Sequence, residues 1–345
     1  QGGQSPSIRG AQRYLMVALL AIPFLLSAIW FVDQFALDPA NSEMAQRALF
    51  PAALGFGLLL AVFPFGTWMP ALSADAPPVV TAFIFTAGQA MAFYLTLRFL
   101  GSAPWIVGHS TTSSVMLLSG LIMALGGGIM AASQRDLGRL FGYAALSNLG
   151  FLLLGFGTGG SQGLTLALLH LINRTVAIVL LAMSLAILRH WATSDKFEHL
   201  HGTAQRLPIA TAGLMLGGLA LAGFPLTAGF PTQWAIGRSI LNWVQPLSAA
   251  GQAQALMDIQ IASGTPWVWI LTLLSLVASS VGIIVGLLRG LGAMLSGAPR
   301  QDIAKQPLIA SLMVLALMAA TILLGLYPDL FLEPVRAAVE AFSLF

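Results

Sequence analysis

The sequence predicts an all-α membrane protein with many transmembrane helices. Hydrophobic residues make up 57% of its 345 residues, charged residues only 8%, and the mean hydropathy is +0.87. Soluble domains usually hold about 25% charged residues, so this composition excludes a water-exposed globule. Apolar stretches of about 20 residues, enough to cross a bilayer core roughly 30 Å thick, recur along the chain. The number of spans is therefore the first quantity to establish.

The apolar stretches predict about nine spans, each bounded by polar residues. They cover residues 14–32, 47–71, 77–100, 112–132, 139–158, 162–189, 208–230, 267–289 and 306–327. The polar segments that separate them are 33–46, 72–77, 101–110, 133–137, 158–163, 189–207 and 288–306. The stretch 231–266 is less distinct, because 233–244 also reads as a continuation of the seventh span after an interruption.

Two of these spans contain proline and glycine inside the apolar run. The second span ends in Phe-Pro-Phe-Gly-Thr-Trp-Met-Pro, and the seventh ends in Gly-Phe-Pro-Leu-Thr-Ala-Gly-Phe. An interrupted helix at membrane depth is tolerated only where protein or a polar cavity shields the freed backbone groups, and such interruptions also mark transport sites. We therefore predict two broken helices, with Pro64, Pro70, Pro225 and Gly229 at the breaks.

The basic residues are divided unequally between the two sides of this arrangement. The side of the N-terminus holds Arg9, Arg13, Arg135, Arg139, Arg189, Lys196, Arg206, Arg289, Arg300 and Lys305, and the other side holds Arg47, Arg98, Arg238 and Arg336. Because positive loops stay inside, we predict an integral protein of a bacterial inner membrane with this N-terminus cytoplasmic and the C-terminus outside. The net charge of +3 is topological on this interpretation, so lipids are expected partners and nucleic acid is not.

Ionisable residues at mid-membrane depth are the default candidates for function, because burying a charge there is costly. The interior of the spans offers only His170 and Arg174, which share one helix face with Asn173 close by. Ser147 and Asn148 add a polar stripe on the fifth span. These five residues are the candidate proton path. The alternative is that they form interhelical hydrogen bonds that fix packing.

Other chemistry is not indicated. The chain has no cysteine, phosphate-binding loop, zinc motif or nucleophile elbow, and the pair His199 and His201 is a weak metal signal. We expect no catalytic residue, no metal and no cofactor in this polypeptide.

Several segments resemble one known family, in order and almost without gaps over about 47–245. They are Phe65–Val79 with Tyr94 and Arg98, Ser133–Phe151, His170–Asn173, Leu200–Pro208 and Gly223–Phe230. These segments are similar to motifs of the antiporter-like, proton-translocating subunits of respiratory complex I, related hydrogenases and Mrp-type cation/proton antiporters.

The resemblance implies a fold of two five-helix repeats of inverted topology, each with one broken helix, in a bundle of about fourteen helices. On that template the chain begins before the sixth helix, so its first repeat is incomplete. The expected divisions are a polar segment at 1–13, three helices of the first repeat at 14–100, five helices of the second repeat at 101–290, and a C-terminal helix and tail at 291–345. The second broken helix is expected at about 208–245.

The family implies buried lysines that carry protons, and this sequence departs from that pattern. The matching positions hold Leu59 and Ala90 in the first half, and Ile178 and Gln233 in the second, while Arg174 stands where a histidine is expected. A buried lysine gives and takes protons, whereas leucine, alanine and isoleucine do not. Water near Thr81 and Thr86 still offers a route, although it lacks charged switch points.

The preferred hypothesis is therefore an antiporter-like membrane subunit of a complex I-like or Mrp-like assembly, as a structural or reduced-pumping paralogue. A working proton channel in the same assembly is the alternative within that class. The chain would be at most a non-catalytic membrane subunit of an NADH:quinone oxidoreductase-type complex, with other membrane subunits as partners. Two further hypotheses stay open: an independent secondary transporter for a cation or small solute, and a scaffold of another energy-transducing complex.

Overall fold

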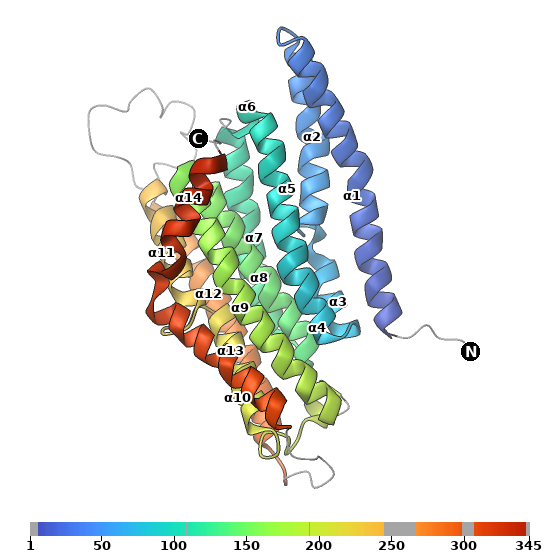
Figure 1. Cartoon of the computed structure of the whole chain (residues 1–345), viewed down its shortest axis with the longest axis vertical. Coiled ribbons are helices and arrows are strands. Elements are labelled where there is room, and N and C mark those ends of the chain that lie inside the picture. Colours follow the sequence, from blue (N-terminus) through green and yellow to red (C-terminus); the bar gives the residue numbers. More distant parts are fainter. Residues whose placement is uncertain (1–5, 108–109, 193, 245–265, 299–306, 343–345) are drawn as a thin grey trace.

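The computed structural model describes residues 6–107, 110–192, 194–244, 266–298 and 307–342 as an elongated bundle of helices (Figure 1). No strand occurs within these ranges. Residues 1–5 of the predicted polar segment and 245–265 of the less distinct stretch lie outside the described residues. The all-α membrane fold expected from composition is confirmed.

The long helices follow the predicted spans closely. In chain order the elements are α1 (Pro6–Leu37), α2 (Ser42–Leu59), α3 (Trp68–Asp75), α4 (Pro78–Phe83), a π-helical turn (Ile84–Gly88), α5 (Gln89–Ser102), α6 (Pro104–Val107), α7 (Ser110–Ser133), α8 (Leu137–Gly157), α9 (Gly160–Ala192), α10 (Pro208–Leu221), α11 (Gly229–Val244), α12 (Pro266–Leu295), α13 (Leu308–Leu326) and α14 (Leu332–Phe342), with short 3₁₀ turns at Phe65–Thr67, Phe197–His199 and Pro328–Phe331. Helix α4, the π turn and α5 run on as one span, Pro78–Ser102.

Seven of the described helices are long and apolar enough to cross a membrane unbroken. The two predicted spans that do not reach this length are the two that contain breaks. Each is divided into shorter helices, α2 with α3 and α10 with α11, because the chain leaves helical geometry in the middle. The figure of nine spans stays a prediction.

The first break follows Leu59. Ala61 has a positive φ of 53°, and the next α-helical residue is Trp68. Around the break, backbone bonds depart from the α-helical spacing: the N–H of Val62 donates five residues back to Gly57 O at 2.8 Å, and that of Phe65 donates three residues back to Val62 O at 2.7 Å. The carbonyl oxygen of Leu59, at the end of α2, instead accepts from the side chain of Gln89.

The second break lies between Leu221 and Gly229. Gly223 and Leu226 have positive φ values of 70° and 69°. Glycine is needed at 223 for space as well, because a Cβ there would lie 2.8 Å from the Cδ atom of Gln233. The backbone at Gly223 therefore passes close to the Gln233 side chain, in a conformation that favours glycine.

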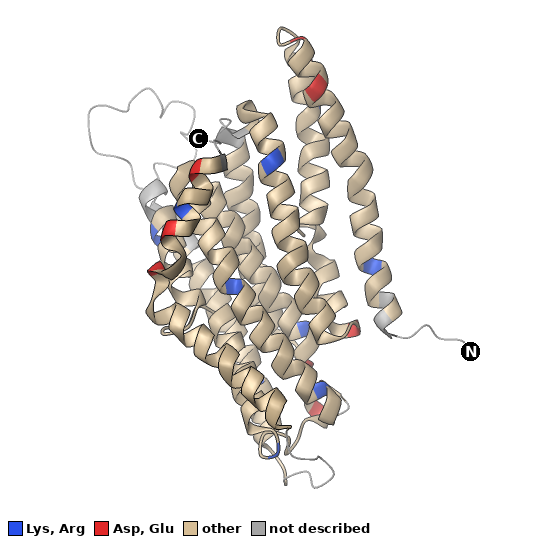
Figure 2. Ribbon diagram, viewed as in Figure 1, with Lys and Arg blue, Asp and Glu red and all other residues tan. Residues whose placement is uncertain are grey.

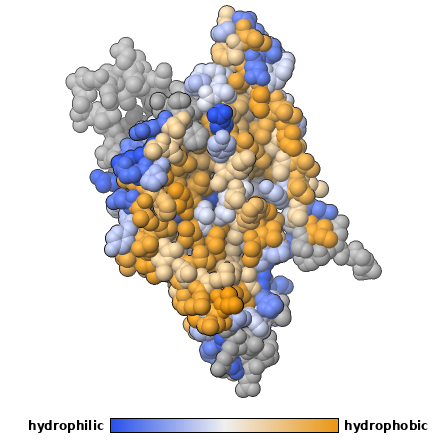
Figure 3. Space-filling view, viewed as in Figure 1, coloured by the Kyte–Doolittle hydropathy of each residue, from blue (hydrophilic) through white to orange (hydrophobic). Residues whose placement is uncertain are grey.

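The outside of the bundle suits lipid. Large apolar side chains are exposed along α1, α7, α12 and α13, and the visible face is mostly hydrophobic between more polar ends (Figure 3). Charged residues gather mainly toward the ends of the helices (Figure 2). This is the distribution expected of an integral membrane protein.

Helix α8 is the centre of the bundle, packed against α7, α9, α3, α10, α11 and α12. Its span is 89% buried, far more than the others. Small residues let the neighbouring backbones approach. On α12, Gly282 and Gly286 face the backbone of α7 at Gly128 and Ala131. The three helices α8, α7 and α12 therefore pack by small-residue contact.

Gly282→Ala tests this packing. A Cβ at 282 would lie 2.6 Å from the backbone carbon of Gly128, so α12 must move away, at a cost of about 1–3 kcal/mol. We expect a clearly lower apparent Tm in detergent. Gly126→Ala is the matched control on α7, because a Cβ there meets nothing within 4 Å. Equal Tm values for the two variants would contradict close packing of α12 on α7.

Candidate functional site

Two buried amides, Asn148 and Gln233, meet at the second break and bind the same backbone carbonyl. The carbonyl oxygen of Leu221, at the end of α10, accepts from Asn148 Nδ2 at 2.6 Å and from Gln233 Nε2 at 3.0 Å. Gln233 Nε2 also donates to Asn148 Oδ1 at 3.3 Å, and Asn148 Nδ2 donates to Ala144 O at 3.1 Å. Both amides are buried. They join α8, α10 and α11 by satisfying a carbonyl that the break leaves without a helical partner.

His170, on α9, is fully buried beside this pair and also binds the backbone. Its Nε2 lies 3.1 Å from the carbonyl oxygen of Asn148, and its Nδ1 lies 3.0 Å from Thr232 Oγ1 on α11. A nitrogen that faces a carbonyl oxygen must carry hydrogen, so Nε2 is the donor. In the neutral ring Nδ1 is then an acceptor for the Thr232 hydroxyl, whose single hydrogen also has Gly229 O within reach at 3.2 Å. Both ring nitrogens are therefore occupied by partners within the protein.

Arg174, one turn further along α9, is 1% exposed and also faces carbonyl groups. One Nη atom donates to Phe85 O at 3.1 Å and the other to Ala145 O at 3.3 Å. Phe85 belongs to the π turn, where the wider spacing frees carbonyls from the regular ladder. Among the described residues Arg174 forms no ion pair, and its Nε has no hydrogen-bond partner. The guanidinium thus stabilises the π turn while its charge stays uncompensated within those residues.

The structure separates the other two candidates from this group. Ser147 contacts different helices from Asn148: its hydroxyl donates to Ala124 O on α7 at 3.0 Å and lies 2.7 Å from Ser279 Oγ on α12. Asn173 is buried, and within the part of the chain that the structure describes no hydrogen bond of its side chain is recorded. The polar stripe predicted on α8 therefore forms two separate helix contacts: Ser147 contacts α7 and α12, and Asn148 contacts α10 and α11.

A charged clamp lies at the end of the bundle where α3 stops. Arg189 in the last turn of α9 binds Asp195 Oδ2 at 2.5 Å, and donates to Ser73 O and Ala76 O, both at 2.8 Å. Asp195 Oδ2 also accepts from the backbone N–H of Gly138 at 3.1 Å. The clamp joins the end of α3, the short helix after the first break, to the start of α8 and the end of α9.

A family model described as NADH:quinone oxidoreductase/Mrp antiporter, TM, matches residues 7–256. The chain belongs to this family. NADH-quinone oxidoreductase subunit N of Methylococcus capsulatus is 31% identical over 244 residues, which is 63% of this chain and 48% of that protein. Formate hydrogenlyase subunit 3 of Escherichia coli is 27% identical over 305 residues, 83% of this chain and 47% of that protein. The chain thus spans about half the length of these relatives.

Solved structures of the antiporter family agree in fold. A chain of the Mrp complex from Dietzia sp. aligns with a TM-score of 0.78 at 17% identity, over 97% of this chain and 68% of that one. A chain of respiratory complex I from Thermus thermophilus aligns with a TM-score of 0.67 at 22% identity, over 94% and 68%. At these identities the likeness shows the shared fold.

The positions matched to antiporter-family lysines lie in different surroundings. Ile178 is fully buried in the apolar core. Leu59 ends α2, Ala90 lies in the first turn of α5, and Gln233 belongs to the amide network. That these were lysine positions stays a prediction.

Several residues of the site escape a search for ionisable groups. Thr232, which faces His170, is one residue before Gln233 and carries only a hydroxyl. The carbonyl of Phe85 belongs to an apolar side chain, and no Pro or Gly marks the start of its π turn. Only a search for polar residues next to each predicted break finds Thr232, and nothing in the sequence reveals the Phe85 carbonyl.

The amide network predicts non-additive energetics. Asn148→Leu removes two hydrogen bonds from Nδ2 to backbone carbonyls and should lower the free energy of unfolding by about 1–3 kcal/mol, because each buried hydrogen bond contributes about 0.5–1.5 kcal/mol. Gln233→Leu should act in the same direction. Since both amides bind Leu221 O and each other, the double variant should differ from the sum of the two by more than about 0.5 kcal/mol. Asn173→Leu is the matched control, and strict additivity would contradict a shared network.

A second prediction concerns Asp136, the N-cap of α8, which lies outside the spans. Burial raises the pKa of Asp136 above its ordinary 3.8, although the backbone N–H of Arg139, 2.6 Å from Oδ1, opposes part of that rise. A raised pKa means that the folded chain binds this proton more tightly. The contribution to stability is therefore full below pH 3.8 and is lost as pH rises through the folded pKa.

Asp136→Asn removes this titration and keeps a capping oxygen. We expect the apparent Tm of the wild type to gain a component on acidification through the range just above pH 3.8, and the variant to lack it. The measurement is a series of melting curves against pH. Identical pH profiles for the two proteins would contradict the assignment.

Proposed function

We propose that this chain is an antiporter-like membrane subunit of a complex I-like or Mrp-like assembly, and that it serves there mainly as a structural paralogue with little or no proton pumping. The carrying observation is how its buried polar groups are used. Among the buried residues that the structure describes, only His170 and Arg174 are titratable. Arg174 donates to the carbonyl of Phe85 in the π turn, and His170 Nε2 faces the carbonyl of Asn148 within the unbroken helix α8.

A proton path needs groups that gain and lose charge in turn. Arg174 keeps its proton under all ordinary conditions, so it supplies a fixed charge. His170 has the right intrinsic chemistry, but it sits four residues from that fixed positive charge on the same helix face. The remaining groups, Asn148, Thr232 and Gln233, are amides and a hydroxyl. They position hydrogen bonds without storing charge.

The assembly part of the proposal draws on the relatives. Two are a subunit of an NADH-quinone oxidoreductase and a subunit of formate hydrogenlyase, and the structural neighbours come from Mrp and respiratory complexes. We infer that other membrane subunits and lipids surround this chain in a bacterial inner membrane, with its N-terminus cytoplasmic and its C-terminus outside. Any oxidation of a soluble donor would belong to partner subunits.

The same proposal divides the chain by internal symmetry. Residues 14–100 would hold three helices of a first repeat and residues 101–290 the five helices of a second, with residues 291–345 as the closing helix and tail. The occurrence of one interrupted helix in each part, α2 with α3 and α10 with α11, supports this division.

The test is proton flux through the assembled complex in proteoliposomes that contain a pH-sensitive dye. A residue that carries the proton in every turnover costs on the order of 10²-fold or more when it is removed. We expect His170→Ala to leave flux close to wild type, because the ring holds helices together and carries no proton. Thr232→Val, which removes its hydroxyl partner, should behave in the same way.

Assembly is measured in parallel by native gel and by the partner content of the purified complex. Loss of most flux in His170→Ala with assembly intact would overturn the structural-paralogue proposal. Loss of flux together with loss of partner subunits would support it, because the residue would then act through packing.

A further inference from the structure

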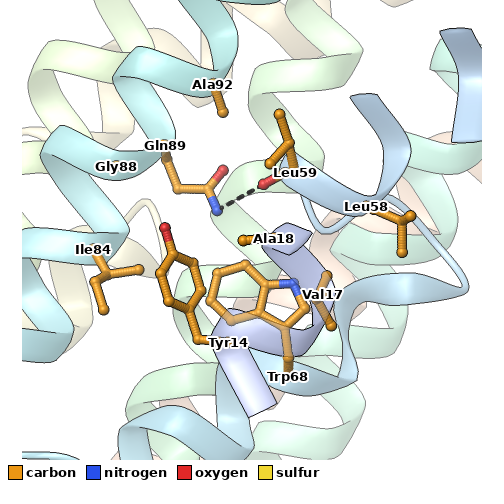
Figure 4. A pocket seen from close by; sticks show the side chains of 10 residues that line it. All are labelled: Tyr14, Val17, Ala18, Leu58, Leu59, Trp68, Ile84, Gly88, Gln89 and Ala92. Atoms are coloured by element: carbon orange, nitrogen blue, oxygen red, sulfur yellow. Dashed lines mark hydrogen bonds between the residues drawn. The ribbon is translucent and has the colours of Figure 1, made fainter. Parts of the chain in front are cut away.

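Two buried polar atoms beside the first break have no hydrogen-bond partner among the residues that the structure describes. Trp68 is 4% exposed and its indole Nε1 makes no hydrogen bond, and Gln89 is 2% exposed and its Oε1 makes none. An unsatisfied buried donor or acceptor is costly, so each such atom in a native structure needs an explanation. Both atoms belong to residues that line one cavity (Figure 4).

The cavity has room for water. It leaves about 30 Å³ for the centres of water-sized molecules, and one water needs roughly 10–15 Å³ measured in this way, so about two fit. It lies between α1, the end of α2, α3 and the π turn, and Tyr14, Trp68 and Gln89 face it (Figure 4).

Polar groups reach the cavity from several elements. The Tyr14 hydroxyl comes from α1, the Trp68 N–H from α3, and the Gln89 amide from the first turn of α5 (Figure 4). The carbonyl of Leu59, the last residue of α2, accepts from Gln89 Nε2 only at 3.5 Å. That distance is beyond the usual 2.7–3.2 Å of a good hydrogen bond, so the freed end of α2 also has unused accepting capacity.

The backbone builds this space. The π turn at Ile84–Gly88 widens the helix directly before Gln89, and both its end residues line the cavity. Gly88 adds no side chain: a Cβ there would lie 3.8 Å from Ile84 Cγ2 and 3.9 Å from the Tyr14 oxygen, which are ordinary contacts. Position 88 would therefore accept a methyl group, so crowding at this position does not account for the cavity.

We propose that this cavity is a hydration site, in which about two water molecules accept from Trp68 Nε1 and donate to Gln89 Oε1. Water provides the donor and the acceptor that these atoms lack. No charged residue lines the cavity, so a bare cation or anion would find no counter-charge. The site completes the hydrogen bonding of the first break, and it holds whether or not the subunit pumps protons.

X-ray hydroxyl-radical footprinting of the full chain in its complex tests the proposal, because radicals formed from bound water label the side chains next to it. We expect Trp68, although buried, to be labelled several-fold faster than Phe141 after correction for intrinsic reactivity. Phe141 is 0% exposed and packs against Phe85 with ring centroids 5.5 Å apart. Labelling of Trp68 at the rate of Phe141 would overturn the proposal.

Gly88→Ala takes up part of the space and should lower Trp68 labelling, while Gly126→Ala, whose Cβ meets nothing within 4 Å, should leave it unchanged. Labelling that Gly88→Ala does not alter would also overturn the proposal.

Melting curves give a second, independent readout. Gln89→Met keeps the length of the side chain and removes the amide. A hydrated site loses a bound partner, so Tm should fall. A dry site would lose an unsatisfied oxygen, so a rise in Tm would count against hydration.

Discussion

The whole structure depends on keeping backbone groups hydrogen-bonded at membrane depth. Inside hydrocarbon an unpaired N–H or C=O cannot form a hydrogen bond with water, which is why unbroken helices dominate membrane proteins. In the described part of its spans this chain departs from that rule in three places: after Leu59, after Leu221 and at the π turn Ile84–Gly88. Each departure frees carbonyl groups, and the buried donors Gln89, Asn148, Gln233 and Arg174 bond carbonyls at these departures. Their positions are set first by what the backbone requires.

The departures are satisfied by different means. At the second break two neutral amides, Asn148 and Gln233, share the carbonyl of Leu221. The π turn receives a charged donor, Arg174, on Phe85 O. The first break has only a long contact from Gln89, beside a cavity of water size. The rings of Trp68, Phe85 and Phe141 follow one another in contact, with centroids 6.2 Å and 5.5 Å apart. These three aromatic rings form an apolar layer that runs from the cavity, through the π turn, to α8.

The sequence carries the fold and the position of both breaks, because apolar length and the Gly-Phe-Pro type of interruption are local features. It also places His170 and Arg174 on one face, since a spacing of four residues is helical geometry. What it does not carry is the partner of each polar group. Ser147 and Asn148 are adjacent in sequence, yet one faces Ser279 and the other Leu221 O. That divergence follows from the packing of α8 between helices far apart in the chain, which no local pattern encodes.

The use of polar groups as backbone partners bears directly on proton handling. A side chain that moves a proton must exchange one set of hydrogen bonds for another at each step. When one of its partners is a freed carbonyl in hydrocarbon, that exchange leaves the carbonyl unpaired, at about 1–3 kcal/mol for each group. Arg174 is in this position through Phe85 O in the π turn, whereas His170 faces the carbonyl of Asn148 within the unbroken helix α8. Water in the first break carries no such restriction, because it reorients without moving the backbone. The proposed loss of pumping thus rests on buried groups held in fixed hydrogen bonds, Arg174 at the π turn and the amides Asn148 and Gln233 at the second break.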